Sequence, residues 1–326
     1  MLMAAAAVHY AAGRSAVFAL ARPDGSDPGR RALGQWLPIA ATVIAATLFG
    51  HPEIAVSVIF GTSVACLSLV LGLATYLAPL QNLPASRRVW PFVLPAALLP
   101  FMAGFSGHIS WWHALMMLGL GGAVLSVWLQ APDAPTTPHE ERPEPGIMSM
   151  AILGAVALAA VGAVLSVKGV ILSSQYAQLL TAGTLAATIL SPLLVLPTLG
   201  TASLVAQRGY AGQALSALVG TVLLNLCALL PLTAILWYVT SLHGHGPDQA
   251  AAADGHGLLN PFAGLNGLPY AMATWRIETV MLVVLGFALT PVAMGRWVLG
   301  RLESVLLVVG YAAYLGIVAI FGGRFI

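Results

Sequence analysis

The chain has 326 residues, of which 59% are hydrophobic and only 7% are charged, and its mean hydropathy is +0.90. Soluble domains carry roughly 25% charged residues, so this composition excludes a soluble globular protein and indicates an integral membrane protein. The formal net charge is only +2. The lipid bilayer is therefore the expected partner, and nothing in the charge balance points to nucleic acid.

Apolar stretches long enough to cross a bilayer, which takes about 20 residues as a helix, follow one another along the chain. They cover residues 2–21, 33–49, 53–79, 90–105, 110–130, 148–172, 178–206, 211–240, 273–295 and 299–322. We therefore expect an all-α membrane protein with about ten transmembrane helices. The first stretch has no positively charged start and carries Arg14, which favours a retained helix over a cleaved signal peptide.

Residues 131–146 are rich in proline and glutamate, which predicts an extended, solvated linker. The linker separates a first unit, 1–130, from a second unit, 147–326, and each unit contains five of the expected helices. If the N-terminus lies outside the cytoplasm, nine arginines fall in inward loops and only Lys168, Arg276 and Arg324 fall outside. This distribution fits the positive-inside rule. We expect a bacterial inner membrane, both termini outside, and a cytoplasmic linker.

The two units share a sequence pattern. A shift of 159 residues places LPIAATVIAATLFG, which begins at residue 37, on LPTLGTASLVAQRG, which begins at residue 196. The same shift matches Pro38 with Pro197 and Gly61 with Gly220. Five helices per unit is an odd number, so the second copy would be inverted in the membrane. Matched helix breaks in inverted repeats indicate a binding site near the midplane, whereas one such break alone would favour simple helix packing.

Residues 34–73 and 195–232 resemble the two repeats of the cation/calcium exchanger superfamily, the sodium/calcium exchanger membrane domain. In that family a Gly-Thr-Ser-x-Pro-Glu helix precedes a helix with Gly-Asn-x-x-Gly-Ser-Asn-Ile-x-Asn. Residues 300–316 are similar to the family's last helix, and residues 109–129 are a weaker copy. The resemblance implies a secondary transporter that holds its cation with the Glu after each proline and with oxygens on the following helix.

This sequence departs from the family at both central acids, where it has Ile39 and Thr198. Calcium takes six to eight oxygen ligands, and a buried divalent ion without counter-charge costs tens of kcal/mol. We therefore expect a substrate other than calcium, either a monovalent ion or a small neutral solute. The residues expected to bind it are Gln35, Thr42, Ser57, Thr62, Cys66, Thr198, Thr201, Ser216, Thr221 and Asn225. Helix breaks are expected at Pro38, Gly61, Pro197 and Gly220.

A non-transporting membrane subunit or scaffold that keeps the exchanger fold is the alternative, because an apolar side chain at Ile39 offers nothing to an ion. Three acids lie outside the loops and the linker. Glu53 is interpreted as a helix N-terminal residue, Glu278 as an interfacial anchor beside Trp275 and Arg276, and Glu303 as a helix cap.

The loop at 241–257 gathers three histidines, His243, His245 and His256, with Asp248 and Asp254. Their spacing fits no closed metal site, so a solvated loop is favoured and metal capture is the alternative. The sequence contains no phosphate-binding loop, nucleophile elbow or HExxH pair. We expect no enzymatic activity, no metal and no cofactor.

Overall fold

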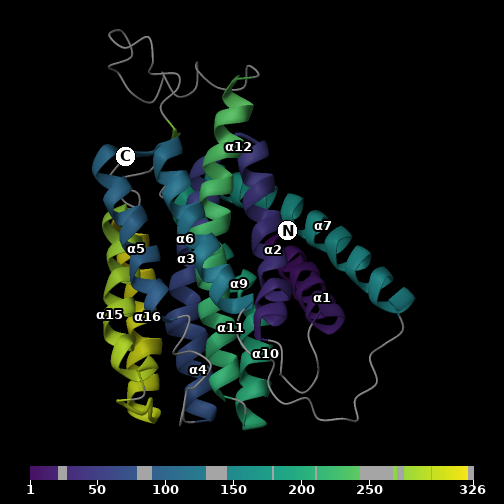
Figure 1. Cartoon of the computed structure of the whole chain (residues 1–326). Coiled ribbons are helices and arrows are strands. Elements are labelled where there is room, and N and C mark those ends of the chain that lie inside the picture. The colour runs from purple at the N-terminus through teal and green to yellow at the C-terminus, as the bar shows by residue number, and fades with distance from the viewer. Residues whose placement is uncertain are drawn as a thin grey trace.

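The computed structural model describes residues 1–20, 28–78, 90–129, 145–177, 180–209, 211–242, 267–269, 275–294 and 296–321. These residues are almost entirely helical (Figure 1). Five of the described helices are long and apolar enough to cross a membrane, namely Pro52–Leu77, Met148–Tyr176, Ala182–Gln207, Gly212–Thr240 and Arg301–Phe321. An all-α membrane protein is confirmed, whereas ten spanning helices stay a prediction.

The first unit begins with α1 and α2 and continues through a long helix that contains a π-helical turn. The elements are α1 (Leu2–Leu20), α2 (Pro28–Leu48), α3 (Pro52–Ala65), η1 (Cys66–Val70), α4 (Leu71–Leu77), η3 (Trp90–Phe92), α5 (Val93–Ala103), η4 (Gly104–Ser106), β1 (His108–Ile109) and α6 (Trp111–Leu129). The turn η1 is a π-helix that joins α3 to α4 without a break in the helix.

The residues after the linker form a second series of helices, in which short strand β2 pairs antiparallel with β1. Its elements are α7 (Pro145–Ala177), α8 (Ala182–Leu185), η5 (Ala186–Leu190), α9 (Ser191–Leu194), α10 (Leu196–Gln207), α11 (Ala211–Leu224), η6 (Asn225–Leu229), α12 (Leu230–Leu242), β2 (Leu268–Pro269), η8 (Trp275–Thr279), α15 (Val280–Ala293) and α16 (Arg301–Phe321). Helix α7 has 33 residues, or about 50 Å. It exceeds the hydrocarbon thickness of about 30 Å and is inclined to α11 and α12 (Figure 1).

Helix ends and π turns recur at the residue shift that aligns the two sequences. Helices α3 and α11 both have 14 residues, and each runs into a five-residue π turn. The turns before them place Gly50 at φ 78° and Gly209 at φ 87°, a left-handed conformation that glycine adopts without strain. The segment of α3 and η1 and the segment of α11 and η6 therefore share local geometry as well as sequence pattern.

The structure corrects three of the four expected helix breaks. Helix α2 runs through Pro38, α3 through Gly61 and α11 through Gly220. The fourth, Pro197, comes two residues after a non-helical turn at Val195, between α9 and α10. Transmembrane helices tolerate proline where their neighbours satisfy the freed backbone groups, and glycine narrows a helix without ending it.

The two matched prolines meet at α1. A Cβ atom on Gly13 would lie 2.8 Å from Cβ of Pro197 and 3.5 Å from Cγ of Pro38. Helix α1 packs closely along α7 and α2, and most of its buried residues are alanines. Small side chains let helices approach closely in a membrane. Gly13 therefore allows the two proline-containing helices to lie against α1 at one point.

Burial divides the helices into a central group and a peripheral group. The most apolar part of Pro52–Leu77 is 94% buried, whereas that of Arg301–Phe321 is only 22% buried. Large apolar side chains such as Leu302, Leu306 and Val309 are exposed on α16. In a bilayer these side chains face lipid, so the continuous helix through α3, η1 and α4 forms the core of the protein.

Candidate functional site

A polar cluster lies where α3 meets the π turn η6. The amide Nδ2 of Asn225 donates to Oγ1 of Thr62 at 3.0 Å and to Oγ of Ser63 at 3.1 Å. All three residues are fully buried. The cluster, called the central polar cluster below, unites Thr62 and Asn225 from the expected set and adds Ser63. π-Helical turns inside α-helices are frequent at functional sites, and η6 begins at Asn225.

The two hydroxyl groups of the central polar cluster already donate hydrogen bonds to backbone carbonyls of α3. Thr62 donates to the carbonyl of Val58 at 2.6 Å, and Ser63 donates to that of Ile59 at 2.7 Å. The Oδ1 atom of Asn225 has no hydrogen-bond partner among the described residues. A buried, unpaired oxygen is costly, so this atom is positioned to accept a hydrogen bond or to bind a cation.

A second polar contact joins α2 to α10. Gln35 donates its amide to the hydroxyl of Thr201, and Oε1 of Gln35 has no described partner. Thr198 is fully buried, and its Oγ1 also lacks a described partner. Three expected site residues thus present or support unpaired oxygens, although the hydroxyl of Thr201 itself donates to the carbonyl of Pro197 at 3.0 Å.

The remaining expected residues face other neighbours. Ser57 lies beside α8, with its Oγ 3.2 Å from the position of a Cβ on Gly183. Thr221 donates to the carbonyl of its own helix at Ala217, and Ser216 is buried on the same helix. Cys66 is fully buried in η1. The structure therefore places these residues in the core, and it does not join them to the central polar cluster by described hydrogen bonds.

Thr42 belongs to a cluster that the sequence analysis missed. Nε2 of His9 lies 3.0 Å from Oγ of Ser166 and 3.3 Å from Oγ1 of Thr42. The three residues come from α1, α7 and α2 and are fully buried. Gly162 makes room for the imidazole, since a Cβ there would lie 2.8 Å from the ring. A histidine among alanines, opposite a glycine, is the sequence signal that could have identified the cluster.

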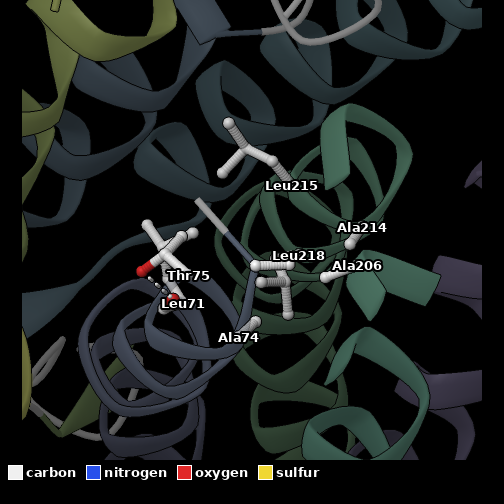
Figure 2. A pocket seen from close by; sticks show the side chains of 8 residues that line it. Leu71, Ala74, Thr75, Ala206, Ala214, Leu215 and Leu218 are labelled. Carbon is white, nitrogen blue, oxygen red and sulfur yellow. Dashed lines mark hydrogen bonds between the residues drawn. The ribbon is translucent and has the colours of Figure 1, made fainter. Parts of the chain in front are cut away.

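An apolar crevice opens between α4, α10 and α11 (Figure 2). It is lined by Leu71, Ala74, Thr75, Ala78, Ala206, Ala214, Leu215 and Leu218. The hydroxyl of Thr75 donates back to the carbonyl of Leu71 at 2.8 Å, so it does not present a free donor to the crevice. The crevice is too narrow to hold a water molecule. It does not reach the central polar cluster.

Two of the three acids are placed as the sequence suggested. Glu53 lies in the first turn of α3 and its Oε1 is 2.9 Å from Nδ1 of His51. Glu303 caps α16 by accepting the backbone N–H of Gly300 at 2.9 Å. The interpretation of Glu278 as an interfacial anchor is wrong, because its side chain is only 2% exposed and contacts α16.

The histidine-rich loop at 241–257 lies almost entirely outside the described residues. Within the described part of the chain, no group of three or more His, Cys, Asp or Glu side chains is arranged to hold a metal ion. Metal capture by the loop stays an alternative.

The fold is similar to those of solved cation exchangers. A structure of the sodium-calcium exchanger NCX_Mj is 17% identical, with a TM-score of 0.61, and the match covers 97% of this chain and 94% of that one. A structure of the H+/Ca2+ exchanger CAX is 15% identical, with a TM-score of 0.68, and covers 98% and 82%. No curated protein sequence matches the chain.

A family model described as sodium/calcium exchanger protein matches residues 31–129 and 148–320. These two regions flank the linker and include both segments whose motifs resemble exchanger repeats. Together with the helical fold, the match shows that this integral membrane chain belongs to the sodium/calcium exchanger protein family.

Proposed function

We propose that the protein is a secondary transporter made of two inverted five-helix repeats, with ten transmembrane helices in a bacterial inner membrane. The recurrence of π turns and left-handed glycines at Gly50 and Gly209 supports the repeat. Both termini would lie outside the cytoplasm and the linker at 131–146 inside it. A reporter fused after Ile326 should be active outside, and one in the linker inside. The reverse pattern would contradict the orientation.

The proposed substrate is a monovalent cation or a small neutral solute, and the central polar cluster carries this proposal. The cluster offers amide and hydroxyl oxygens from Asn225, Thr62 and Ser63. Ile39, at the position where the resemblance implies a glutamate in the family, is an apolar and fully buried side chain. The solved relatives are named for Na+, Ca2+ and H+ exchange. Without a carboxylate in the cluster, dehydration of a divalent ion would not be offset.

Ion flux into sealed vesicles tests the substrate. Purified protein should give no sodium-driven calcium uptake above empty vesicles, and it should exchange labelled Na+ or another monovalent ion across a gradient. Asn225→Leu should abolish that exchange, because it removes the buried amide and keeps the side-chain volume. Thr240→Val is the matched control, since the hydroxyl of Thr240 only bonds its own helix. Sodium-driven calcium uptake would overturn the proposal.

The double variant Ile39→Glu with Thr198→Glu tests the same reasoning in the opposite direction. It would restore the two acids that the family carries, and we expect calcium binding by calorimetry in preparations that remain monodisperse. Calcium binding by the unmodified protein with equal affinity would show that these two positions do not decide the selectivity. The carboxylates would be partly neutralised by the bound ion, which is why folding yield should rise when calcium is present.

A non-transporting subunit or scaffold is the second candidate, and the burial of the polar residues favours it. Thr62, Thr221 and Asn225 are fully buried, and the apolar crevice does not reach them. The reactivity of the two native cysteines can distinguish a transporter from a scaffold. Cys66 lies in the core one turn from Thr62, whereas Cys227 packs against α6, where a Cβ on Gly121 would lie 2.9 Å from its carbonyl oxygen.

Thiol labelling separates the two candidates. A transporter that alternates between outward and inward access should expose Cys66 to a maleimide in a Cys227→Ser background, and a transported ion should change the rate. Cys227 in a Cys66→Ser background is the control and should stay unreactive in native protein. Equal protection of both thiols in membranes, at all ion concentrations, would favour the scaffold.

A further inference from the structure

Glu278 is a carboxyl group that the central polar cluster does not use. It lies in the π turn η8, at the start of the helix that continues as α15, and is 2% exposed. The hydroxyl of Tyr314 on α16 donates to its Oε1 at 3.3 Å. Its Oε2 atom is buried and has no hydrogen-bond partner among the described residues. The carboxyl group therefore accepts one long hydrogen bond, and its other oxygen has no described partner.

A second tyrosine completes the surroundings of Glu278. Tyr311 lies one helical turn before Tyr314, and the centroids of the two rings are 5.7 Å apart. Both tyrosines are at most 3% exposed. The hydroxyl of Tyr311 also lacks a described partner, and it is close enough to interact electrostatically with Glu278 and with Cys66. Two buried, unpartnered oxygens thus lie in one small region between η8, α16 and η1.

Tyr311 and Cys66 lie near the middle of two helices that are long and apolar enough to cross a membrane. Tyr311 is the middle residue of α16, Arg301–Phe321, and is about 15 Å along the axis from either end. Cys66 lies near the middle of the continuous helix Pro52–Leu77, about 16 Å from its nearer end. Glu278 interacts with Tyr311 and Tyr314 and is therefore remote from both ends of α16. Ionisable groups at such depth are expensive and are typical of ion and proton pathways.

No described positive charge neutralises Glu278. The elements that pack against η8 are α3, α5, α15 and α16. Their charged or titratable groups, together with those of η8 itself, are Glu53, Arg276, Arg301, Glu303, Tyr311 and Tyr314. Arg276 is exposed, and Arg301 is the first residue of α16, ten residues before Tyr311. No ion pair among the described residues includes Glu278. An uncompensated buried charge costs several kcal/mol, so a bound cation has to neutralise the carboxylate.

The donor set favours a proton over a metal ion. Calcium takes six to eight oxygens, whereas the described side chains that interact with the carboxylate are two phenols, those of Tyr311 and Tyr314. A proton needs only one oxygen, and it can bind the vacant Oε2 of Glu278. The protonated carboxyl can then donate to a neighbouring oxygen, for which the unpartnered hydroxyl of Tyr311 is available.

We propose that Glu278, flanked by Tyr311 and Tyr314, is a proton-binding site in the membrane interior, separate from the central polar cluster. The carboxylate takes up one proton to become neutral and releases the same proton to return to the carboxylate, with no other bond formed or broken. A role for this proton in driving exchange rests on the proposed transport function. The existence of the site does not.

Infrared difference spectroscopy of the purified protein in lipid vesicles tests the site without a transport assay. Stepping the pH should produce a C=O stretching band of a protonated carboxyl that shifts in D2O. Glu278→Gln should remove this band, and Glu303→Gln, which changes the exposed cap of α16, should leave it. Tyr314→Phe should keep the band and move its frequency, because the hydrogen bond to Oε1 is lost. Tyr314→Phe also keeps the test valid if Glu278→Gln does not fold.

Three results would overturn the proposal. The first is a band that persists unchanged in Glu278→Gln. The second is an insensitivity of the band to Tyr314→Phe. The third is a carboxylate that stays ionised at every pH and responds only to added Na+, which would mean that a metal cation occupies the site. If the band behaves as expected but vesicles show no ion flux, the proton site stands and the transport function fails.

Discussion

Asn225→Asp is a direct test of how dry the central polar cluster is. The substitution replaces the donor Nδ2, which bonds Thr62 and Ser63, with a carboxylate oxygen of nearly the same size. Neither hydroxyl can donate to the new oxygen without leaving the carbonyl of Val58 or Ile59. The carboxylate would therefore be buried without a donor or a counter-charge.

The expected cost follows from these contacts. An uncompensated buried charge destabilises a protein by roughly 3–5 kcal/mol, and two lost hydrogen bonds add about 1 kcal/mol each. Asn225→Leu is the matched control, since it loses the same two bonds and introduces no charge. We expect the Asp variant to unfold at a clearly lower temperature than the Leu variant.

Thermal unfolding in detergent, followed by tryptophan fluorescence, measures the difference. Low pH, or a monovalent cation that binds the new carboxylate, should return the Asp variant toward the stability of the Leu variant, because either one neutralises the charge. The Leu variant should not respond to either. An Asp variant as stable as the wild type at neutral pH without added salt would refute the reasoning, because it would show that water reaches Asn225.

Two further predictions concern α1. Gly13→Ala should lower the free energy of unfolding by about 1–3 kcal/mol, because its Cβ would lie 2.8 Å from Cβ of Pro197. The control Gly154→Ala, whose Cβ meets no atom within 4 Å, should be neutral or stabilising. Equal effects of the two substitutions in chemical denaturation would contradict this packing. His9→Leu should lower the free energy of unfolding by about 1 kcal/mol, since interhelical hydrogen bonds in membranes average about 0.6 kcal/mol and His9 contacts two hydroxyls. In a double-mutant cycle, the effect of His9→Leu should be smaller in a Ser166→Ala background. Additive effects would show that the two side chains do not interact.

The sequence predicted the fold class because long apolar stretches and a repeated proline and glycine pattern are direct consequences of a helical membrane fold. Thr62 and Asn225 were both among the predicted site residues, but the repeat matches them with Thr221 and Cys66 rather than with each other, so it does not predict their hydrogen bond. The sequence did not reveal Ser63, because the apolar residues of α3 follow no periodicity that would show which face meets η6. Three expected helix breaks were wrong, since proline and glycine are tolerated inside membrane helices.

Glu278 shows a different limit of sequence reasoning. Neighbouring Trp275 and Arg276 are typical of a membrane interface, and this pattern suggested an anchor at the water boundary. Burial of the carboxyl group depends on the packing of α16 against η8, and Tyr314, which contacts the carboxyl group, lies more than thirty residues further along the chain. Such a contact between distant segments leaves no local pattern, so only the tertiary structure reveals it.

The interface between α1 and α7 also determines what resists relative motion of these two helices. Most buried side chains of α1 are methyl groups of alanine, and Ala155, Ala159 and Ala163 are buried on α7. A translation by one helical turn, about 5.4 Å, would replace alanine contacts with similar alanine contacts at little energetic cost. The same translation would separate His9 from Ser166. The activation barrier to sliding would therefore be concentrated in one histidine, and substituting it would change the rate of the motion more than its end states.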